Sequence, residues 1–140
     1  MRPTYETNAD HIVEELIADQ LRDTWKCALS RTPRKYPYDY VAEVNGKVAA
    51  LIEIKSRNNA HDKYPTYMIS ADKIVTCQTA ASTLGLRFFL VVSFNDQLMY
   101  WVYRKDDFTV DLGGRRDRND DADWEPVVHI PMTHFKKVTT

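Results

Sequence analysis

The stretch YPYDYVAEVNGKVAALIEIKSR, residues 36–57, decides the fold of this chain. It predicts two β-strands, Tyr38–Val44 and Lys47–Lys55, joined by the turn residues Asn45 and Gly46. The second strand has the Val, Ala, Leu and Ile content of a core strand, yet it ends in Glu53-Ile54-Lys55. A carboxylate and an ammonium at this end of a core strand are costly to bury, so they indicate a functional role.

The faces of these two strands decide which side chains can act together. Side chains alternate along a strand, so Glu53 and Lys55 share one face. Ile52 and Ile54 share the other face and are expected to pack against a helix. A two-residue Asn-Gly loop would place Asp39 opposite Ile52, on the face away from Glu53, whereas a three-residue loop with a glycine bulge would place it on the same face. A bulge within either strand would also switch the face. Joint action of Asp39 and Glu53 therefore requires an odd loop or a bulge.

Asp39, Glu53 and Lys55 together suggest a specific chemistry. Two carboxylates a few ångströms apart repel each other, so one is protonated unless a cation lies between them. A hard divalent ion such as Mg²⁺ takes oxygen ligands and resolves that conflict. Such an ion lowers the pKa of a bound water and neutralises a phosphate, and a neighbouring lysine can orient the water or stabilise the transition state. This set therefore indicates in-line hydrolysis of a phosphodiester.

The same residues carry a resemblance to a known family. The stretch resembles the core of the PD-(D/E)xK nucleases, in which an Asp opens one strand and Glu-x-Lys closes the next. Here Asp39 is followed by thirteen intervening residues and then by Glu53-Ile54-Lys55. The spacing, the hairpin, the preceding basic loop and the trailing KSR look most like archaeal and phage Holliday-junction resolvases, over residues 8–94. One departure is that Tyr38 precedes the aspartate, with Pro37 one place early.

The resemblance implies a fold, a ligand set and an assembly. The fold would be an α/β, restriction-endonuclease-like core, with a central mixed sheet flanked by helices. Asp39, Glu53 and the backbone carbonyl of Ile54 would bind Mg²⁺, which Mn²⁺ could replace, and Lys55 would be catalytic. A glutamate on the first helix of these resolvases helps to bind metal and maps here onto Glu14. Symmetric cutting of two strands implies a homodimer. The aromatic strand over residues 98–103 could lie at its interface, or be a buried core strand.

Two helix patterns flank the hairpin. In the first, Glu14 lies on the edge of the apolar face and Glu15 points away from it. A second helix is bounded by Ser70 and Gly85. Gln78 within it is a candidate accessory residue, with a plain surface glutamine as the alternative. The apolar residues at helical spacing in the first pattern are Ile12, Val13, Leu16, Ile17, Leu21, Trp25 and Ala28.

The rest of the chain is expected to complete one domain. Residues 86–94 and 98–103 read as strands. Residues 30–37, 57–67 and 104–123 read as loops, and residues 125–135 as a short extended segment. The chain is therefore expected to be a single nuclease domain over residues 1–140, with residues 104–140 as a loop-like or extended tail packed on it.

Charge is distributed unevenly along the chain. The net charge is −1, but residues 106–125 carry a balance of −5 and the remainder is therefore +4. Basic and polar residues around the motif are expected to contact DNA, although a solvated surface is the usual role of such clusters and of Lys73 in particular. The expected DNA contacts are Arg31, Arg34, Lys35, Ser56, Arg57, Asn58, Lys63 and Lys73.

Several classes of protein are not indicated. No apolar run approaches the roughly 18 residues of a membrane span, and the N-terminal residues lack the apolar segment of a secretory signal. Cys27 and Cys77 are isolated, which does not indicate zinc and fits a reducing cytoplasm. The sequence predicts a metal-dependent DNA endonuclease acting on branched or duplex DNA. A non-catalytic nucleic-acid-binding module with the same fold and a single-strand or nicking nuclease stay open as alternatives.

Overall fold

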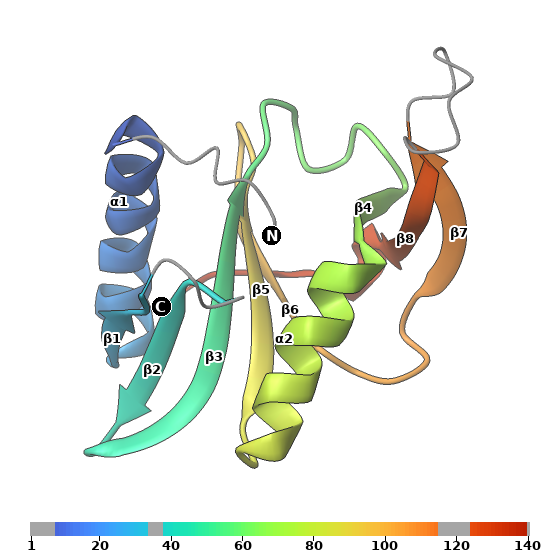
Figure 1. The fold of residues 1–140 in the computed structure, drawn as a ribbon. Coiled ribbons are helices and arrows are strands. Elements are labelled where there is room, and N and C mark those ends of the chain that lie inside the picture. The colour runs from blue at the N-terminus through green and yellow to red at the C-terminus, as the bar shows by residue number, and fades with distance from the viewer. Residues whose placement is uncertain (1–7, 34–37, 115–123, 140) are drawn as a thin grey trace.

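A six-stranded sheet organises the computed structural model, which describes residues 8–33, 38–114 and 124–139 (Figure 1). Its strand order is β1-β2-β3-β5-β6-β9. β3 and β5 pair in parallel and the neighbouring pairs are antiparallel, so the predicted mixed sheet is confirmed. The elements are α1 (Asn8–Trp25), β1 (Ala28–Arg31), β2 (Tyr40–Val44), β3 (Lys47–Ser56), β4 (Thr66–Ser70), α2 (Ala71–Thr83), β5 (Arg87–Ser93), β6 (Leu98–Val102), β7 (Thr109–Gly114), β8 (Trp124–Pro131), the 3-10 helix η3 (Met132–His134) and β9 (Lys136–Lys137).

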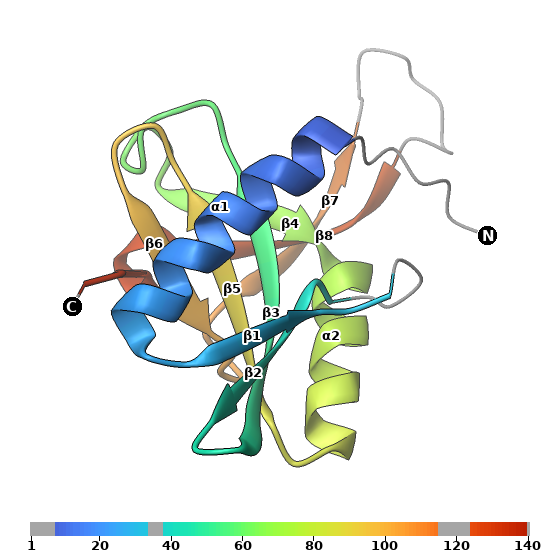
Figure 2. The same ribbon diagram turned by 90° about the vertical axis from the view of Figure 1, so that its left-hand side faces the viewer.

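The two helices cover opposite faces of this sheet (Figures 1 and 2). On the α1 face, Ile52 and Ile54 of β3 pack with Leu21 of the helix. On the α2 face, Leu51 of β3 packs with Ile74 of α2. The predicted alternation along β3 is therefore confirmed, and burial of both faces places the centre of this strand inside the protein.

The β2–β3 hairpin contains the bulge that joint action of Asp39 and Glu53 requires. Near the turn, Val44 lies opposite Lys47, as a two-residue Asn-Gly loop dictates. The register then shifts between Ala42 and Glu43. From Ala42 back to Tyr40, each β2 residue lies opposite a β3 residue one place nearer the C-terminus than the turn alone would give. Tyr40 consequently lies opposite Ile52, which brings the preceding Asp39 into register with Glu53. Of the two predicted possibilities, an odd loop or a bulge, the structure has the bulge, and the extra residue moves Asp39 to the Glu53 face.

A second, three-stranded sheet in the order β4-β8-β7 lies beside α2 (Figure 1). The predicted loop over residues 104–123 is wrong for Thr109–Gly114, and that over residues 57–67 is wrong at its end, where β4 begins. Residues 30–37 were likewise expected as a loop, but β1 extends to Arg31. Val110 and Leu112 are 61% and 54% exposed, so β7 buries neither of these apolar side chains. Its extended structure therefore depends on its pairing with β8.

The strand over residues 98–103, offered as a dimer interface or a core strand, is a core strand. Trp101 is 1% exposed and Met99 is 7% exposed. On the other face of β6, Tyr100 stacks on Phe89 and meets Trp25 edge to face. Both faces of β6 are therefore covered within the chain.

α1 contacts the sheet through a narrower face than its apolar pattern predicts. Ile17 and Leu21 are buried, but Ile12, Val13 and Leu16 are 62%, 44% and 62% exposed. At about 100° per residue the apolar arc is wider than the side that meets the sheet, so part of it faces away. Glu14 lies on the sheet side, as predicted, and its side chain is 15% exposed.

The expectation that Glu15 points away from the body is wrong. The hydroxyl of Tyr40, which is fully buried, donates a hydrogen bond of 2.6 Å to Glu15 Oε2, and Arg22 donates one of 2.7 Å to Oε1. The Tyr40 bond, followed by the arginine charges, lowers the pKa of Glu15. Arg31 donates to the Tyr40 hydroxyl at 2.7 Å. A network of charged hydrogen bonds therefore fixes α1 and β1 to the start of β2.

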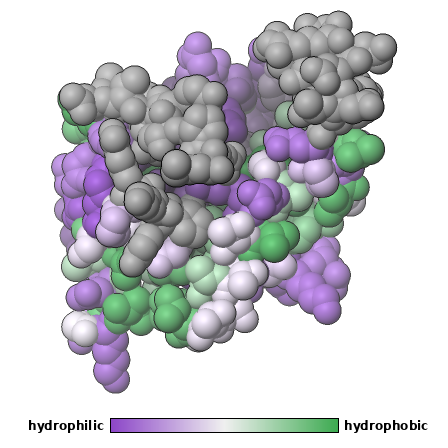
Figure 3. Space-filling model, viewed as in Figure 1, coloured by the Kyte–Doolittle hydropathy of each residue, from purple (hydrophilic) through white to green (hydrophobic). Residues whose placement is uncertain are grey.

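The surface seen in Figure 1 mixes hydrophilic and apolar side chains. Figure 3 shows apolar groups over the lower part of this view, where α2 and the β2–β3 hairpin lie. The exposed apolar residues on these elements are Val44, Val48 and Val75, and Leu84 directly follows α2. Neither described helix has the length and apolarity to cross a membrane.

Removal of the Tyr40 hydroxyl tests the α1 network. We expect Tyr40→Phe to lower the free energy of unfolding by about 2 kcal/mol, because it breaks a buried hydrogen bond to a charged group. Urea unfolding of Tyr40→Phe, Glu15→Ala and the double variant should show a coupling of about 1 kcal/mol. Tyr64→Phe removes a hydroxyl from a side chain that is 56% exposed and should change stability by less than about 0.5 kcal/mol. Strictly additive effects of the two substitutions would contradict the network.

Candidate active site

Asp39 lies just before β2 and is held against β3. Its backbone N–H donates to the carbonyl of Ile52 at 2.9 Å, which extends the ladder of the hairpin by one bond. Its side-chain Oδ2 accepts a hydrogen bond of 2.8 Å from the backbone N–H of Ile54. The carboxylate therefore accepts the hydrogen bond from β3 that a backbone carbonyl would accept if β2 were longer. This bond fixes the orientation of the carboxylate.

Glu53 is the single charged residue buried in the described part of the chain, at 2% exposure. Its Oε1 lies 3.1 Å from Nζ of Lys73 on α2 and 3.5 Å from Nζ of Lys55. Its Oε2 is buried and has no hydrogen-bond partner among the described residues. One oxygen of the carboxylate is thus neutralised by two ammonium groups and the other is left for a further positive ligand.

The electrostatics of Glu53 follow from this position. Burial raises its pKa to about 8, and the negative charge of Asp39 contributes in the same direction. The two lysines oppose this increase but do not cancel it. Asp39 and Glu53 are therefore close enough to disfavour ionisation of Glu53, which is the conflict that a cation between them would remove.

A divalent cation fits this donor set. Because N–H and C=O of one strand residue point to the same side, the Ile54 carbonyl faces the same edge of β3 as its N–H, toward Asp39. Asp39, Glu53 Oε2 and this carbonyl offer only oxygen atoms, which are the ligands that Mg²⁺ and Mn²⁺ prefer. The unpartnered oxygen of Glu53 is the observation that supports the fit.

Lys73 contacts the site more directly than the sequence predicts. The sequence predicts a DNA contact or a solvated side chain, but the side chain is 18% exposed and its ammonium pairs with Glu53. Cys77, one turn further along α2, is fully buried. Burial raises the pKa of this thiol to about 12, and the charge of Glu53 adds to that effect. The first turns of α2 therefore form one wall of the site.

Glu14, the glutamate mapped as a further ligand, is engaged elsewhere in this structure. Its Oε2 accepts a hydrogen bond of 3.0 Å from Arg31 Nη1. Arg31, expected at the DNA surface, also donates to the carbonyl of His11 and to Tyr40. This arginine ties β1 to α1.

The other expected DNA contacts are spread around the end of β3. Ser56 and Asn58 are exposed. The guanidinium of Arg57 lies 4.9 Å from the ring centroid of Tyr67, and the ammonium of Lys63 lies 5.4 Å from that of Tyr64. Arg34 and Lys35 fall outside the described residues. Gln78 is half-buried on α2.

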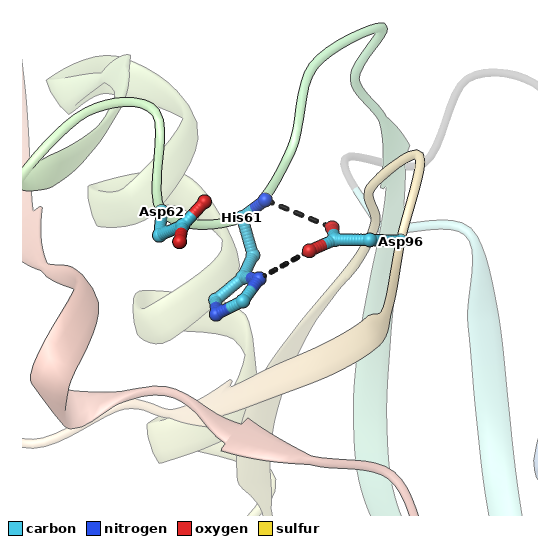
Figure 4. Close-up of side chains that lie close together, drawn as sticks. All are labelled: His61, Asp62 and Asp96. Atoms are coloured by element: carbon cyan, nitrogen blue, oxygen red, sulfur yellow. Dashed lines mark hydrogen bonds and ion pairs between the residues drawn. The ribbon is translucent and has the colours of Figure 1, made fainter.

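A second group of possible metal ligands lies where the loop between β3 and β4 meets the turn between β5 and β6 (Figure 4). His61, Asp62 and Asp96 each offer a ligand atom, and these atoms lie within 4.8 Å of one another. His61 Nδ1 lies 2.6 Å from Asp96 Oδ2, and the His61 backbone N–H donates to Asp96 Oδ1 at 2.9 Å. These bonds fasten the loop to the β5–β6 turn. No pattern in the sequence connects His61 to Asp96, because the two residues are 35 positions apart.

The fold and the site together define a class of protein. A mixed sheet lies between two helices, Asp39 precedes one strand, and Glu53-Ile54-Lys55 ends the next. This arrangement is the restriction-endonuclease-like fold with a PD-(D/E)xK motif. A family model described as "Phage putative PDDEXK endonuclease" matches residues 1–138, and the chain belongs to this family of phage endonucleases.

A solved structure shares this fold. It is Hjc of Archaeoglobus fulgidus, a Holliday junction resolvase from an archaeal hyperthermophile, with a TM-score of 0.52 and 17% sequence identity. The similarity covers 84% of this chain and 89% of that one. No curated protein matches the chain by sequence.

The raised pKa of Glu53 should appear in the stability of the metal-free protein. Between the ordinary value of 4.5 and about 8 the unfolded carboxyl is ionised while the folded one holds its proton, so unfolding releases a proton. Stability should therefore fall by a few kcal/mol as pH rises through this range. We expect Glu53→Gln to lack this fall and to exceed wild type in urea unfolding at pH 8.5 in EDTA.

A matched substitution separates this effect from general titration. Glu125→Gln changes an exposed glutamate on β8 and should follow the wild-type pH dependence. The charged groups around Glu53, namely Asp39, Lys55 and Lys73, remain in both variants. Parallel pH curves for wild type and Glu53→Gln would refute the raised pKa.

Proposed function

We propose that this endonuclease hydrolyses phosphodiester bonds of DNA at Asp39, Glu53 and Lys55, with Mg²⁺ as its cofactor and Mn²⁺ as a substitute. The observation that carries the proposal is the buried Glu53 carboxylate, with Oε1 on two lysines and Oε2 without a described partner. A structural ion pair would use both oxygens, because an unpaired buried charge is costly. A buried carboxylate with one oxygen on two lysines and the other facing no donor in the described part of the chain suits a site that holds a cation.

The protein groups have separable tasks in this mechanism. Asp39, Glu53 Oε2 and the Ile54 carbonyl would hold the ion. When bound, the ion supplies a water of lowered pKa and neutralises the phosphate. The Ile54 N–H fixes the Asp39 carboxylate. Lys73 holds Glu53, so that Lys55, which is one-third exposed, can leave Oε1 and donate to the phosphate or the attacking water.

Glu14 is proposed as a further ligand on the resemblance alone. Its carboxylate pairs with Arg31, so binding of the ion requires this pair to open. Replacement by Ala should then weaken Mn²⁺ binding, and unchanged affinity would exclude the role.

DNA would approach over the end of β3 and the loop that follows. Ser56, Arg57, Asn58 and Lys63 lie there, and Arg34 and Lys35 precede the hairpin in the sequence. These residue types contact phosphates. Lys73, by contrast, acts within the site through Glu53, and Gln78 on α2 is proposed as an accessory residue. Cys27 and Cys77 are not joined in a disulfide, which supports a reducing compartment, and we propose that this is the cytoplasm.

A four-way junction is the proposed substrate, and a homodimer the proposed form. The fold likeness to a Holliday junction resolvase supports the first. Two-fold symmetric cutting requires two sites, which supports the second. The apolar residues Ile12, Val13 and Leu16 on the outer side of α1 give the dimer a candidate contact surface. Sedimentation equilibrium that shows only monomers, with and without a junction, would exclude the dimer.

Cleavage assays test the enzymatic proposal. Protein incubated with Mg²⁺ or Mn²⁺ and labelled four-way junction, duplex or single strand should make symmetric cuts in the junction. We expect Lys55→Ala to reduce the cleavage rate at least about a hundredfold, because it removes the charge that faces the reacting phosphate. Its DNA affinity should stay near wild type, since other cations provide the backbone contacts.

The control for this assay is Lys105→Ala, which removes an exposed lysine from the segment after β6. It should cleave at the wild-type rate. Wild-type cleavage by Lys55→Ala would refute the assignment. Binding of the junction without cleavage under any metal condition would instead support a non-catalytic module.

A further inference from the structure

A pocket of about 440 Å³ opens beside the candidate active site. It lies between the loop after β3, the strand β4 and the C-terminal segment β8–η3, and it lies within the usual volume range of small-molecule sites. Its walls are aromatic and apolar with a few polar groups, as in ligand pockets generally. The lining residues that matter here are Arg57, Tyr64, Tyr67, Met68, Phe94 and His129.

The pocket continues the row of functional side chains on β3. Glu53, Lys55 and Arg57 alternate with Ile54 and Ser56, so all three lie on one face. The Arg57 N–H donates to the carbonyl of Ser93, which continues the β3–β5 ladder past Ser56. Arg57 therefore lies about 7 Å beyond Lys55. This is about two nucleotide steps along one strand of a duplex.

Tyr67 connects the pocket to the active site. It is 4% exposed, and its hydroxyl has no hydrogen-bond partner among the described residues. Burial raises the pKa of this hydroxyl, Arg57 opposes the increase, and the charge of Glu53 adds to it. The hydroxyl thus lies within electrostatic reach of both residues. Buried polar atoms almost always have partners, so this one points to a ligand group that the protein does not supply.

The open side of the pocket offers a surface for stacking. Tyr64 is 56% exposed and Met68 is 52% exposed. The ammonium of Lys63 lies over the Tyr64 ring. The His61–Asp96 bonds hold the loop that forms this wall (Figure 4). An aromatic face flanked by cations is the usual platform for the bases of single-stranded nucleic acid.

We propose that this pocket takes an unpaired nucleobase of the DNA strand, one or two nucleotides from the phosphate that is cut. A base has a flat face to stack against Tyr64 and a polar edge to reach the Tyr67 hydroxyl and Arg57. In a paired duplex the bases are stacked inside, so only an unpaired or extruded base can enter. The pocket therefore favours DNA in which a nucleotide beside the cleavage point is unpaired or can be extruded. This inference rests on the proposed cleavage of DNA at Glu53.

The test measures binding in EDTA, where no cleavage occurs. The probes are a duplex with one unpaired 2-aminopurine nucleotide and the same duplex fully paired. Wild type should bind the first at least about tenfold more tightly, which is the contribution of one stacked base. The 2-aminopurine fluorescence should be quenched on binding. Equal affinity for the two duplexes would overturn the proposal.

Two variants assign this preference to the pocket. Tyr64→Ala should reduce the preference about tenfold by removing the stacking surface. Tyr67→Phe should reduce it about fivefold while leaving the urea midpoint unchanged or higher, because it removes an unpartnered buried hydroxyl. Val75→Ala, at a residue 62% exposed on α2 and outside the pocket, should behave as wild type. Equal losses for both duplexes would show backbone binding and refute the base pocket.

The outcomes separate this proposal from the one on which it rests. Cleavage with Mg²⁺ but no preference for the unpaired nucleotide would refute the pocket alone. A preference for the unpaired nucleotide without cleavage would refute the enzymatic proposal and keep the pocket. Failure to bind either duplex would refute the pocket, and cleavage of the four-way junction would then decide the enzymatic proposal separately.

Discussion

The burial of one carboxylate is the constraint on which the site depends. Glu53 lies in the middle of the sheet at 2% exposure, with the negative charge of Asp39 nearby. Two lysines on Oε1 offset part of the cost, and Oε2 has no described partner. Removing an ion from water without full compensation costs several kcal/mol. The apolar cores on the two faces of β3 must supply the stability that permits this placement.

The part of this arrangement that sequence could predict is local. Alternation along residues 47–55 predicts which side chains share a face, because the period of a strand is two. The Asn45-Gly46 turn is compatible with a two-residue or a three-residue loop, so it leaves the register of the hairpin open. With a two-residue loop and no bulge, Asp39 would face away from Glu53. The need for both carboxylates to meet therefore predicted an odd loop or a bulge, and the structure has a bulge, seen as the register shift after Ala42. The family resemblance strengthened that functional argument and also gave the fold class.

The parts that sequence could not predict depend on contacts between distant segments. Lys73 reads as a surface lysine on α2, and only the packing of α2 against β3 brings it to Glu53. Glu15 reads as a solvent-facing residue, but Tyr40, which is 25 residues away, turns its carboxylate inward. β7 has exposed apolar residues and no core pattern, so its pairing with β8 determines its structure. In each case tertiary context overrides a local pattern.

The sheet formed by β4, β8 and β7 extends the nuclease core beside the candidate active site. β4 and β8 supply walls of the pocket beside Arg57, and β4 leads directly into the helix that carries Lys73. The C-terminal residues therefore help to shape the surface next to the site. A tail without secondary structure could not hold these walls in place.

The central claim is that one divalent cation binds between Asp39 and Glu53. Titration of Mn²⁺ into the protein at pH 8.5, followed by electron paramagnetic resonance of the free ion, measures this directly. When the titration is repeated at several pH values, the affinity of wild type for Mn²⁺ should rise until the pH passes about 8, because Glu53 loses its proton there. Asp39→Asn and Glu53→Gln should each lose this binding. Equal Mn²⁺ binding by wild type and both variants would place the metal elsewhere and contradict the account.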